Sequence, residues 1–432
     1  MGTTTGRRGV LHVVTDPRRR GSQAFAHDLD AALRERGRSS AVVALSGTGE
    51  MDFPVLGPGR LHPSTLRELR RRAAGAGVVI AHGSTTLDAC GIALAGTGTP
   101  FVYVNIGDPR HWARDSLRRA RVGLLLRRAA AIASVSPTGR EILLQTYRLA
   151  PGRVRAIPNG RRPERFRPPD STDRSKARAE LGLPTGATVL VVVGALAVEK
   201  RVALAIEAFA RLVEAASERV EVAAKPPEVT SEPAEPRTSE PTEPPTSEPV
   251  APPTSDRAEL TTTERAEPPT SERAETPTSG PTELPDYHLL VAGEGPERAA
   301  LEALAARRAP GRVTFTGNLA DLGPVYRAGD VLVLSSTSEG VPGVLVEAGM
   351  TAIPAAATDV GFVRDVVVDG VTGALAEVGP GAGDPAPLVA AIRRVLADRE
   401  AMGRAARAHC LERHAMETVV DAWTALLDEH TR

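Results

Sequence analysis

The stretch from Ser335 to Ala348 combines the residue types and the spacing that are best suited to chemistry. Two acidic residues, Glu339 and Glu347, stand eight positions apart. If a helix begins near Gly343, Glu347 lies about one turn inside it and Glu339 lies on the loop before it. The free amides of a helix start bind phosphate, and carboxylates accept hydrogen bonds from sugar hydroxyls. The spacing therefore indicates a site for a phosphate beside a sugar; the plainer alternative is one loop charge and one solvated helix charge.

The elements that position these carboxylates are indicated by an alternation of apolar runs and amphipathic segments along the chain. Short apolar runs predict strands, and longer segments with one apolar stripe predict helices, as in Ser22 to Arg36. The runs form two series, separated near residues 160 to 185. Each series predicts a parallel sheet with helices on both faces, so the fold class is α/β with two Rossmann-like, doubly wound domains. The predicted strands are 10–15, 78–81, 101–104, 132–135 and 154–157, then 188–193, 287–292, 313–315 and 331–334.

The overall composition narrows the class of protein. The chain has 432 residues, 41% hydrophobic and 25% charged, as in a globular protein with a sizeable core. Its 53 basic and 53 acidic residues balance, which argues against a dedicated nucleic-acid binder. The 2 cysteines are too few for a disulfide framework or a four-cysteine zinc site, and they fit a reducing compartment. No apolar run could span a bilayer and no signal peptide is visible, so we expect a cytoplasmic protein.

Residues 226–285 differ from the rest of the chain. They hold 15 of the 36 prolines, together with 13 acidic and 4 basic residues. A Thr-Ser-Glu-Pro unit recurs every eight residues from Thr230, and no copy has an apolar face. Such a composition cannot bury enough surface to offset the entropy of ordering, so it predicts a disordered insertion in the second domain. The insertion is either a tolerated loop expansion or a docking segment for a partner.

Several segments resemble motifs of the retaining GT-B glycosyltransferases of family 4 (glycosyl transferases group 1). The stretch from Glu339 to Glu347 is similar to that family's E-x7-E motif. The resemblance implies the GT-B fold, in which two Rossmann-like domains face a cleft. It divides the chain into domains at 1–165 and 166–415, with 416–432 as a helix that crosses back to the first domain. The other similar segments, in the family's order, are 156–160, 193–201, 291–296, 313–317, 326–331 and 357–361.

The resemblance also implies roles on the donor side. Glu347 is expected to bind the donor ribose, and Glu339 the transferred sugar. Lys200 is expected on the phosphates, where a compact cation stabilises the charge that develops on a leaving diphosphate; the alternative is a lone surface lysine. The remaining expected donor-site residues are Gly343, Val344 and Leu345, whose amides would hold the diphosphate, and Gly194 and Arg201 beside Lys200.

Two departures from the family pattern affect the catalytic roles. Ala195 stands where the family has an arginine, which removes one phosphate cation; Arg201 is a candidate replacement. The family's first-domain histidine is also missing, and Asn105 or Ile106 falls at its position. Asn105, the candidate we retain as catalytic, can donate a hydrogen bond but cannot act as a base. Asp108 is close enough in sequence to be a carboxylate near the acceptor.

Three further features belong to the predicted acceptor side or cleft. His82 follows a predicted strand and resembles a strand-end histidine of the family, either structural or acceptor-lining. Gly21 and Ser22 lie where the family has a glycine-rich loop near the phosphates and the acceptor. The arginines at 18–20 before them either attract an anionic acceptor or form a solvated charge run.

Residues 117–128 could form a basic amphipathic helix. A membrane-surface role would suit a lipid-linked acceptor and would place the protein at the periphery of the inner membrane face. The commoner interpretation is an interdomain or core helix with its arginines outside.

The leading interpretation is therefore an enzyme. It is a retaining, hexosyltransferase-like glycosyltransferase that moves a sugar from a UDP- or GDP-linked donor to a glycan, lipid or small-molecule acceptor. Neither a metal nor a cofactor is expected, because the family needs none and no metal-ligand cluster is visible. Alternatives are a nucleotide-sugar-binding GT-B protein that has lost turnover and a GT-B epimerase or phosphorylase. A dinucleotide-dependent oxidoreductase is disfavoured, because Arg298 occupies the third glycine position after Gly293 and Gly295.

Overall fold

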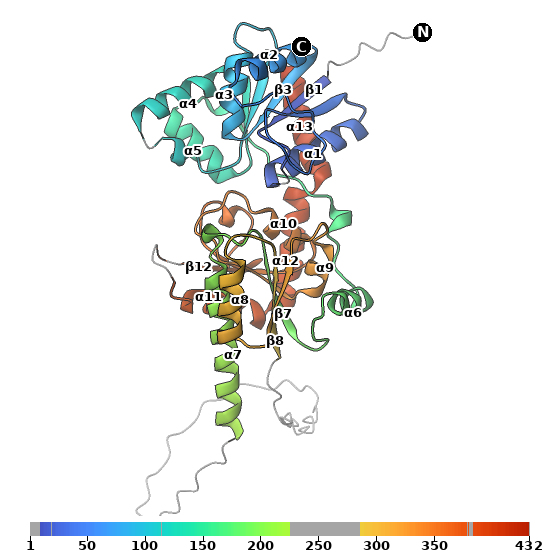
Figure 1. Cartoon of the computed structure of the whole chain (residues 1–432), viewed down its shortest axis with the longest axis vertical. Coiled ribbons are helices and arrows are strands. Elements are labelled where there is room, and N and C mark those ends of the chain that lie inside the picture. The colour runs from blue at the N-terminus through green and yellow to red at the C-terminus, as the bar shows by residue number, and fades with distance from the viewer. Residues whose placement is uncertain are drawn as a thin grey trace, which may run out of the picture. The chain divides into compact units, whose positions relative to one another are not determined.

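The described residues form two parallel β-sheets of six strands each (Figure 1). The computed structural model describes residues 9–18, 20–113, 115–224, 286–377, 379 and 383–431. The prediction of an α/β fold with two Rossmann-like sheets is confirmed. The predicted insertion at 226–285 lies outside the described residues.

The first sheet has the strand order β2-β1-β3-β4-β5-β6, and its strand pairs are parallel. Its inner strands are rich in Val, Ile and Ala and are buried on both faces, as expected where helices cover each side. Its strands are β1 (Gly9–Val14), β2 (Ser40–Ala44), β3 (Ala76–His82), β4 (Phe101–Asn105), β5 (Ala131–Ser134) and β6 (Val154–Ala156). Its helices are α1 (Gly21–Glu35), α2 (Pro63–Ala73), α3 (Ser84–Ala93), α4 (Ser116–Arg128) and α5 (Pro137–Tyr147).

The second sheet has the order β12-β11-β10-β7-β8-β9 and is also parallel. The strands β7, β8 and β10 and the start of α10 match the residues predicted from the sequence. The strands are β7 (Thr188–Val193), β8 (Tyr287–Ala292), β9 (Val313–Gly317), β10 (Val331–Leu334), β11 (Ala355–Thr358) and β12 (Gly373–Ala376). The helices are α6 (Ser171–Glu180), α7 (Val202–Ala224), α8 (Arg298–Arg308), α9 (Gly323–Ala328), α10 (Gly343–Met350), α11 (Ala386–Ala397) and α12 (Arg399–His414).

Each sheet contains one point at which the strand order reverses. In the first sheet it lies between β1 and β3, and in the second between β7 and β10. Open α/β sheets bind ligands outside the carboxyl ends of the strands at such a point, because the connections leave in opposite directions and open a crevice. The loops that follow β7 and β10 are therefore the part of the second sheet where a ligand is expected.

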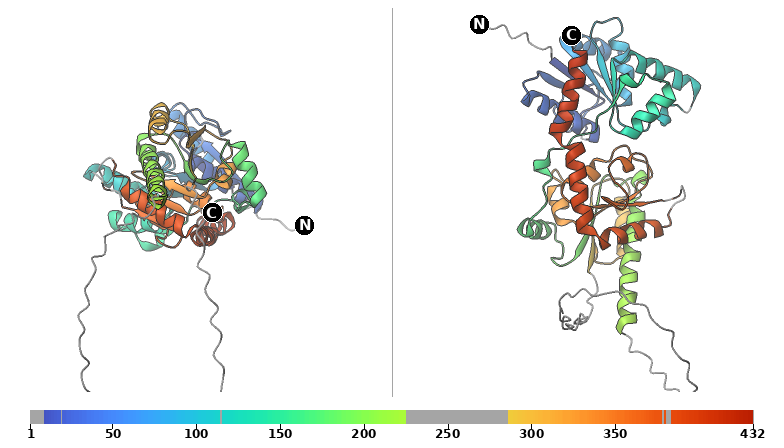
Figure 2. Two further views of the ribbon diagram at one scale, coloured as in Figure 1. Left: turned by 90° about the horizontal axis from the view of Figure 1, so that it is seen from below. Right: turned by 180° about the vertical axis from the view of Figure 1, so that it is seen from behind.

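The last helix, α13 (Met416–His430), completes the core of the first sheet. Trp423 is fully buried and belongs to the same apolar cluster as Phe25 and Leu29 of α1. The right-hand view of Figure 2 shows this red helix running along the blue elements of the first sheet. Within the described part of the chain, no helix combines the length and the apolar character needed to cross a membrane.

Candidate functional site

Lys200 and Glu339 meet at the reversal point of the second sheet. Lys200 ends a short 3-10 turn, η4 (Val198–Lys200), which follows β7, and Glu339 lies on the loop after β10. The Lys200 ammonium lies 2.5 Å from Oε1 of Glu339. The hydroxyl of Ser336 donates to the same carboxylate oxygen at 2.6 Å. The structure thus brings together the two charged residues that the sequence predicts to act on the phosphates and the transferred sugar.

Hydrogen bonds to backbone carbonyls connect the β7 loop and the β10 loop. The Ser335 hydroxyl donates to the carbonyl of Lys200 at 2.9 Å, and the amide of Thr337 donates to the carbonyl of Glu199 at 2.8 Å. Arg201 adopts a left-handed conformation (φ 45°) and donates through Nε to the carbonyl of Ser335 at 3.0 Å. Partial burial lowers the pKa of Arg201. Arg201, proposed from sequence as a replacement phosphate cation, is thus engaged with the backbone of the β10 loop.

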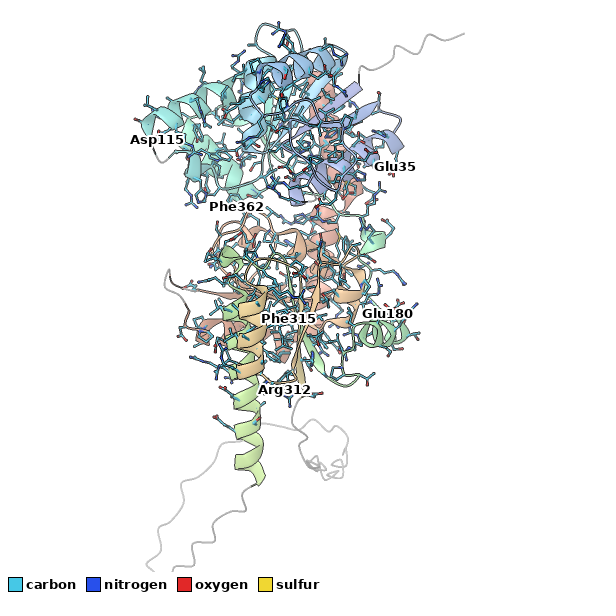
Figure 3. The ribbon with its side chains drawn as sticks, in the orientation of Figure 1. Glu35, Asp115, Glu180, Arg312, Phe315 and Phe362 are labelled. Atoms are coloured by element: carbon cyan, nitrogen blue, oxygen red, sulfur yellow. The ribbon has the colours of Figure 1, made fainter. Side chains whose placement is uncertain are left out.

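A glycine lets the loop after β11 approach Glu339 closely. Gly361 has a φ of 57°, and a Cβ at this position would collide with the carbonyl oxygen of Glu339. The next residue, Phe362 (labelled in Figure 3), is 1% exposed and packs against Gly139 of α5. The loop that carries Glu339 is therefore bonded by the β7 loop at Ser335 and Thr337 and approached by the β11 loop at Glu339 itself.

Glu347, one turn into α10, makes two hydrogen bonds within the protein. The Tyr326 hydroxyl donates to Oε2 at 2.8 Å, and Nε of Arg161 donates to Oε1 at 2.7 Å. The side chain of Glu347 is 12% exposed. Burial, and then the neighbouring carboxylate, raise the pKa of Tyr326 well above its usual value. Burial alone would lower the pKa of Arg161, but the Glu347 carboxylate outweighs it and raises that pKa.

Arg161 and Tyr326 are site residues that the sequence analysis did not identify. Arg161 directly follows the segment 156–160, and Tyr326 opens the segment 326–331, but neither segment indicates a contact with α10. No local signal singles out Arg161, because its contact with α10 is long-range. A Cβ on Gly343 would collide with Nη2 of Arg161, so the glycine leaves room for the guanidinium in its observed position.

The three amides predicted to hold the diphosphate lie at the start of α10. Pro342 precedes the helix without a side-chain cap, and the amide of Leu345 donates to the carbonyl of Pro342 at 3.2 Å, so this amide already has a partner. Gly343 and Val344 begin the helix, where amides lack intrahelical partners. Gly194 directly follows β7 with a φ of 148°, and its amide donates to the carbonyl of Ala292 at 3.0 Å. The donor-side candidates therefore all lie at the carboxyl ends of β7 and β10 or on the helix that follows.

His82 is buried at the end of β3 and paired with His12. Nδ1 of His12 and Nε2 of His82 are 3.0 Å apart, and the two rings stack. Burial lowers the pKa of His82 to about 3, and burial together with His82 holds the pKa of His12 well below its usual value. With 2% of its surface exposed, His82 fits the structural interpretation better than the acceptor-lining one.

Gly21 and Ser22 form the start of α1, beside a small charged network. The Ser22 hydroxyl donates to Oε1 of Gln23 at 2.7 Å. Asp16, which follows β1, accepts hydrogen bonds from Arg18 at 2.8 Å and from Arg20 at 3.3 Å. These bonds, chiefly that from Arg18, lower the pKa of Asp16. Arg18 and Arg20 are therefore partly neutralised, while position 19 lies outside the described residues.

Asn105 and Asp108 lie at and just after the end of β4. Asn105 is buried and donates to the carbonyl of Gly107 at 3.1 Å, and its Oδ1 has no partner among the described residues. Asp108 pairs with Arg110 at 2.6 Å; although burial raises the pKa of this carboxyl, the Arg110 hydrogen bonds lower it overall. A Cβ on Gly340 would lie 2.6 Å from the carbonyl oxygen of Ile106, so the β4 loop meets the loop that carries Glu339.

Family models match both halves of the chain. Residues 278–398 match the model described as Glycosyl transferases group 1, and residues 19–165 match the model described as Glycosyltransferase Family 4.

Among curated proteins, D-inositol 3-phosphate glycosyltransferase of Geodermatophilus obscurus is 42% identical over 108 residues, 24% of this chain and 23% of that protein. The 2-deoxystreptamine glucosyltransferase of Streptomyces kanamyceticus is 36% identical over 121 residues, 25% of this chain and 31% of that protein. The lipopolysaccharide core biosynthesis glycosyltransferase LpsE of Rhizobium meliloti is 31% identical over 148 residues, 33% of this chain and 42% of that protein. The matched stretches span less than half the length of each relative.

Solved structures share the whole architecture. HepE of Anabaena, in complex with UDP and glucose, has a TM-score of 0.69 at 17% identity, covering 98% of this chain and 100% of that one. Sucrose-phosphate synthase of Thermosynechococcus elongatus has a TM-score of 0.67 at 18% identity, covering 98% and 99%. The chain therefore belongs to glycosyltransferase family 4, the glycosyl transferases group 1, and has the GT-B fold that its motifs predict.

Proposed function

We propose that the chain is a retaining glycosyltransferase that moves a sugar from a nucleoside-diphosphate sugar to an acceptor. The observation that carries the proposal is the Lys200–Glu339 pair, with its 2.5 Å separation, at the reversal point between β7 and β10. A cation and a carboxylate side by side in that place suit a ligand that combines an anionic diphosphate with a polyhydroxylated sugar.

Each donor-side residue has a defined task in this proposal. Lys200 and the amides at the start of α10 stabilise the negative charge on the departing diphosphate. Glu339 accepts hydrogen bonds from hydroxyls of the transferred sugar, and Glu347 accepts them from the ribose. The acceptor attacks from the face that the diphosphate leaves, which retains the configuration at the anomeric carbon. Asn105 cannot act as a base, and because it is fully buried it serves in this proposal to hold the end of β4, through its hydrogen bond to Gly107, beside the loop that carries Glu339.

We propose that the donor sugar is linked to a nucleoside diphosphate. UDP-sugars should be tested first and GDP-sugars second. Support for UDP comes from HepE, whose complexes hold UDP, UDP-glucose, or UDP and glucose. The test is incubation of the full chain with a panel of UDP- and GDP-sugars and a mixture of glycan, lipid and small-molecule acceptors, followed by mass spectrometry. A product heavier than its acceptor by one sugar supports the proposal, and NMR of its anomeric proton tests retention. Binding of donors without any product would leave only the second candidate.

That second candidate is a nucleotide-sugar-binding protein without turnover. Two observations favour it: Ala195 offers no cation, and the Arg201 guanidinium is bonded to the backbone of the β10 loop. Calorimetry with the same donor panel separates the candidates, because this one binds a donor and transfers nothing.

We also propose that this protein binds peripherally to a cytoplasmic membrane face if its acceptor is a lipid. Helix α4 is the element that supports this position. Leu117 is 84% exposed and Leu124 is 63% exposed, and exposed arginines at 118, 121 and 128 accompany them. Apolar side chains among cations suit an anionic bilayer surface. Flotation with phosphatidylglycerol vesicles should carry the protein upward, and Leu117→Ser with Leu124→Ser should reduce that fraction severalfold. Equal flotation of both proteins would exclude this role for α4.

A further inference from the structure

Glu347 receives one hydrogen bond from within the protein on each of its two carboxylate oxygens. Tyr326 bonds Oε2 and Arg161 bonds Oε1, at 2.8 and 2.7 Å. We propose that Arg161 and Tyr326 are positioning residues, which make Glu347 an acceptor for two adjacent hydroxyl groups, so that the site selects ribonucleotides over 2′-deoxyribonucleotides. This inference rests on the proposed function, in which Glu347 faces the donor ribose.

The number of acceptor positions on the carboxylate supports this assignment. Two carboxylate oxygens offer about four lone-pair positions in total. One position on each oxygen is already used, so about one remains on each. A pair of hydroxyls on neighbouring carbons can fill both remaining positions at once, as the 2′ and 3′ hydroxyls of ribose do. The Glu347 side chain keeps 12% of its surface exposed, so it remains within reach of a ligand.

Tyr326 is held in place at its ring. The side chain is fully buried, and the ring packs edge-on against Phe166 with 6.0 Å between the ring centroids. Burial and the adjacent carboxylate raise its pKa well above the ordinary value, so its hydroxyl remains a donor at neutral pH. Since a phenol donates only one hydrogen, Tyr326 must direct that hydrogen to Oε2.

Arg161 is held in place at both its backbone and its guanidinium. Its amide donates to the carbonyl of His414 at 2.8 Å, and its carbonyl accepts from the amide of Met416 at 2.9 Å. Its Nη1 donates to the carbonyl of Gly160 at 3.0 Å. The side chain is 11% exposed, and the absence of a side chain at Gly343 leaves room for Nη2. A guanidinium fixed at so many points fixes the plane of the carboxylate that it meets.

The test is calorimetric binding of UDP, 2′-deoxy-UDP, GDP and 2′-deoxy-GDP to the full chain. The natural protein should bind its preferred ribonucleotide about tenfold or more tightly than the deoxy form, since a hydrogen bond to a charged group is lost. Tyr326→Phe keeps the ring and Arg161→Met keeps the bulk, and each should reduce that ratio at least threefold. Arg161→Lys, which keeps the charge without the planar fork, should also reduce it, and it serves if Arg161→Met does not fold.

Two matched variants control for general effects. Tyr103→Phe removes another buried phenol hydroxyl, one with no partner among the described residues, and Arg162→Met removes the neighbouring arginine, which pairs with Glu35. Both should keep the natural ratio. If Tyr326→Phe and the Arg161 variants only lower the unfolding temperature and leave the ratio unchanged, or if the natural protein binds both forms equally, the inference is wrong while the proposed function stands. If the natural protein binds none of the four nucleotides, both fall.

Discussion

Lys200 keeps 30% of its side chain exposed although it is bonded to Glu339. An ion pair that water can reach contributes little to folding, about 1 kcal/mol or less. The same ammonium is worth much more against a diphosphate, whose charge increases as the bond to the sugar breaks. If the proposed function is right, Lys200 contributes mainly to catalysis, and its contribution to folding is minor.

Lys200→Ala should lower kcat by about a hundredfold or more, while the free energy of unfolding changes by about 1 kcal/mol. The measurements are sugar transfer at saturating donor and urea unfolding on the same preparation. Lys176→Ala, on an exposed lysine of α6 whose ammonium is 4.0 Å from Glu180, is the matched control and should change neither quantity. A variant that keeps its full kcat would remove Lys200 from the mechanism.

The site residues that could be predicted from the sequence are those that stand in a local motif. Glu339, Glu347 and Lys200 each stand in a segment whose residue types indicate chemistry. Arg161 does not, because its role comes from a contact with a residue 186 positions away. Likewise, the partner of His82 is His12, which lies 70 positions away on another strand. Pairings of this kind can be inferred only when the order of the strands in the sheet is known.

Among the elements, the loops after β7, β10 and β11 act together. The β7 loop bonds the β10 loop through Ser335 and Thr337, and the β11 loop meets Glu339 at Gly361. Because three loops share contacts around one carboxylate, a shift in one of them moves the charged pair.

Gly361→Ala should displace the backbone of Glu339 and reduce sugar transfer at least tenfold, with a loss of about 1 to 3 kcal/mol in unfolding free energy. The control is Gly182→Ala, at a glycine with a φ of 65° whose added Cβ would meet nothing within 4 Å. That variant carries the strain of a left-handed backbone without the collision, so it should lose some stability and keep its transfer rate. Equal losses of transfer in both variants would show that the contact with Glu339 is unimportant.

The strands whose bounds are predicted best are those with continuous runs of large apolar residues. β7, β8 and β10 contain runs of Val and Leu, and their observed bounds match the predicted ones. β11 (AAAT) and β12 (GALA) were not predicted, because Ala and Gly do not favour strands over helices. They become strands because a parallel neighbour is available on the same edge of the sheet.

For the whole molecule, buried histidines link stability to pH. Burial lowers the pKa of His82 to about 3 and that of His414 to about 4, and it holds the pKa of His12 well below the usual 6.5. As the pH falls below about 6.5, the unfolded chain binds protons that the folded chain cannot, so the free energy of unfolding falls. The contribution of each ring is complete above pH 6.5 and is lost towards its folded pKa.

We expect the unfolding free energy to fall by about 2 kcal/mol between pH 6 and pH 4.5 from His82 alone. Urea unfolding at several pH values across this window measures the slope. His82→Asn removes one titrating ring and should give a shallower slope, whatever its effect on stability at pH 7.5. A slope that is the same in both proteins would mean that His82 takes up its proton in the folded state.

The position of α13 also sets an order of events during synthesis. Trp423, Leu426 and Leu427 fill the same apolar cluster as Phe25 and Leu29, which are made some four hundred residues earlier. While the ribosome is still producing the second sheet, one face of the first sheet is covered by α1 but lacks α13, and exposed apolar surface of this kind promotes aggregation of nascent chains. The half of the protein that emerges first is therefore the half that finishes folding last, after residue 427 has left the exit tunnel.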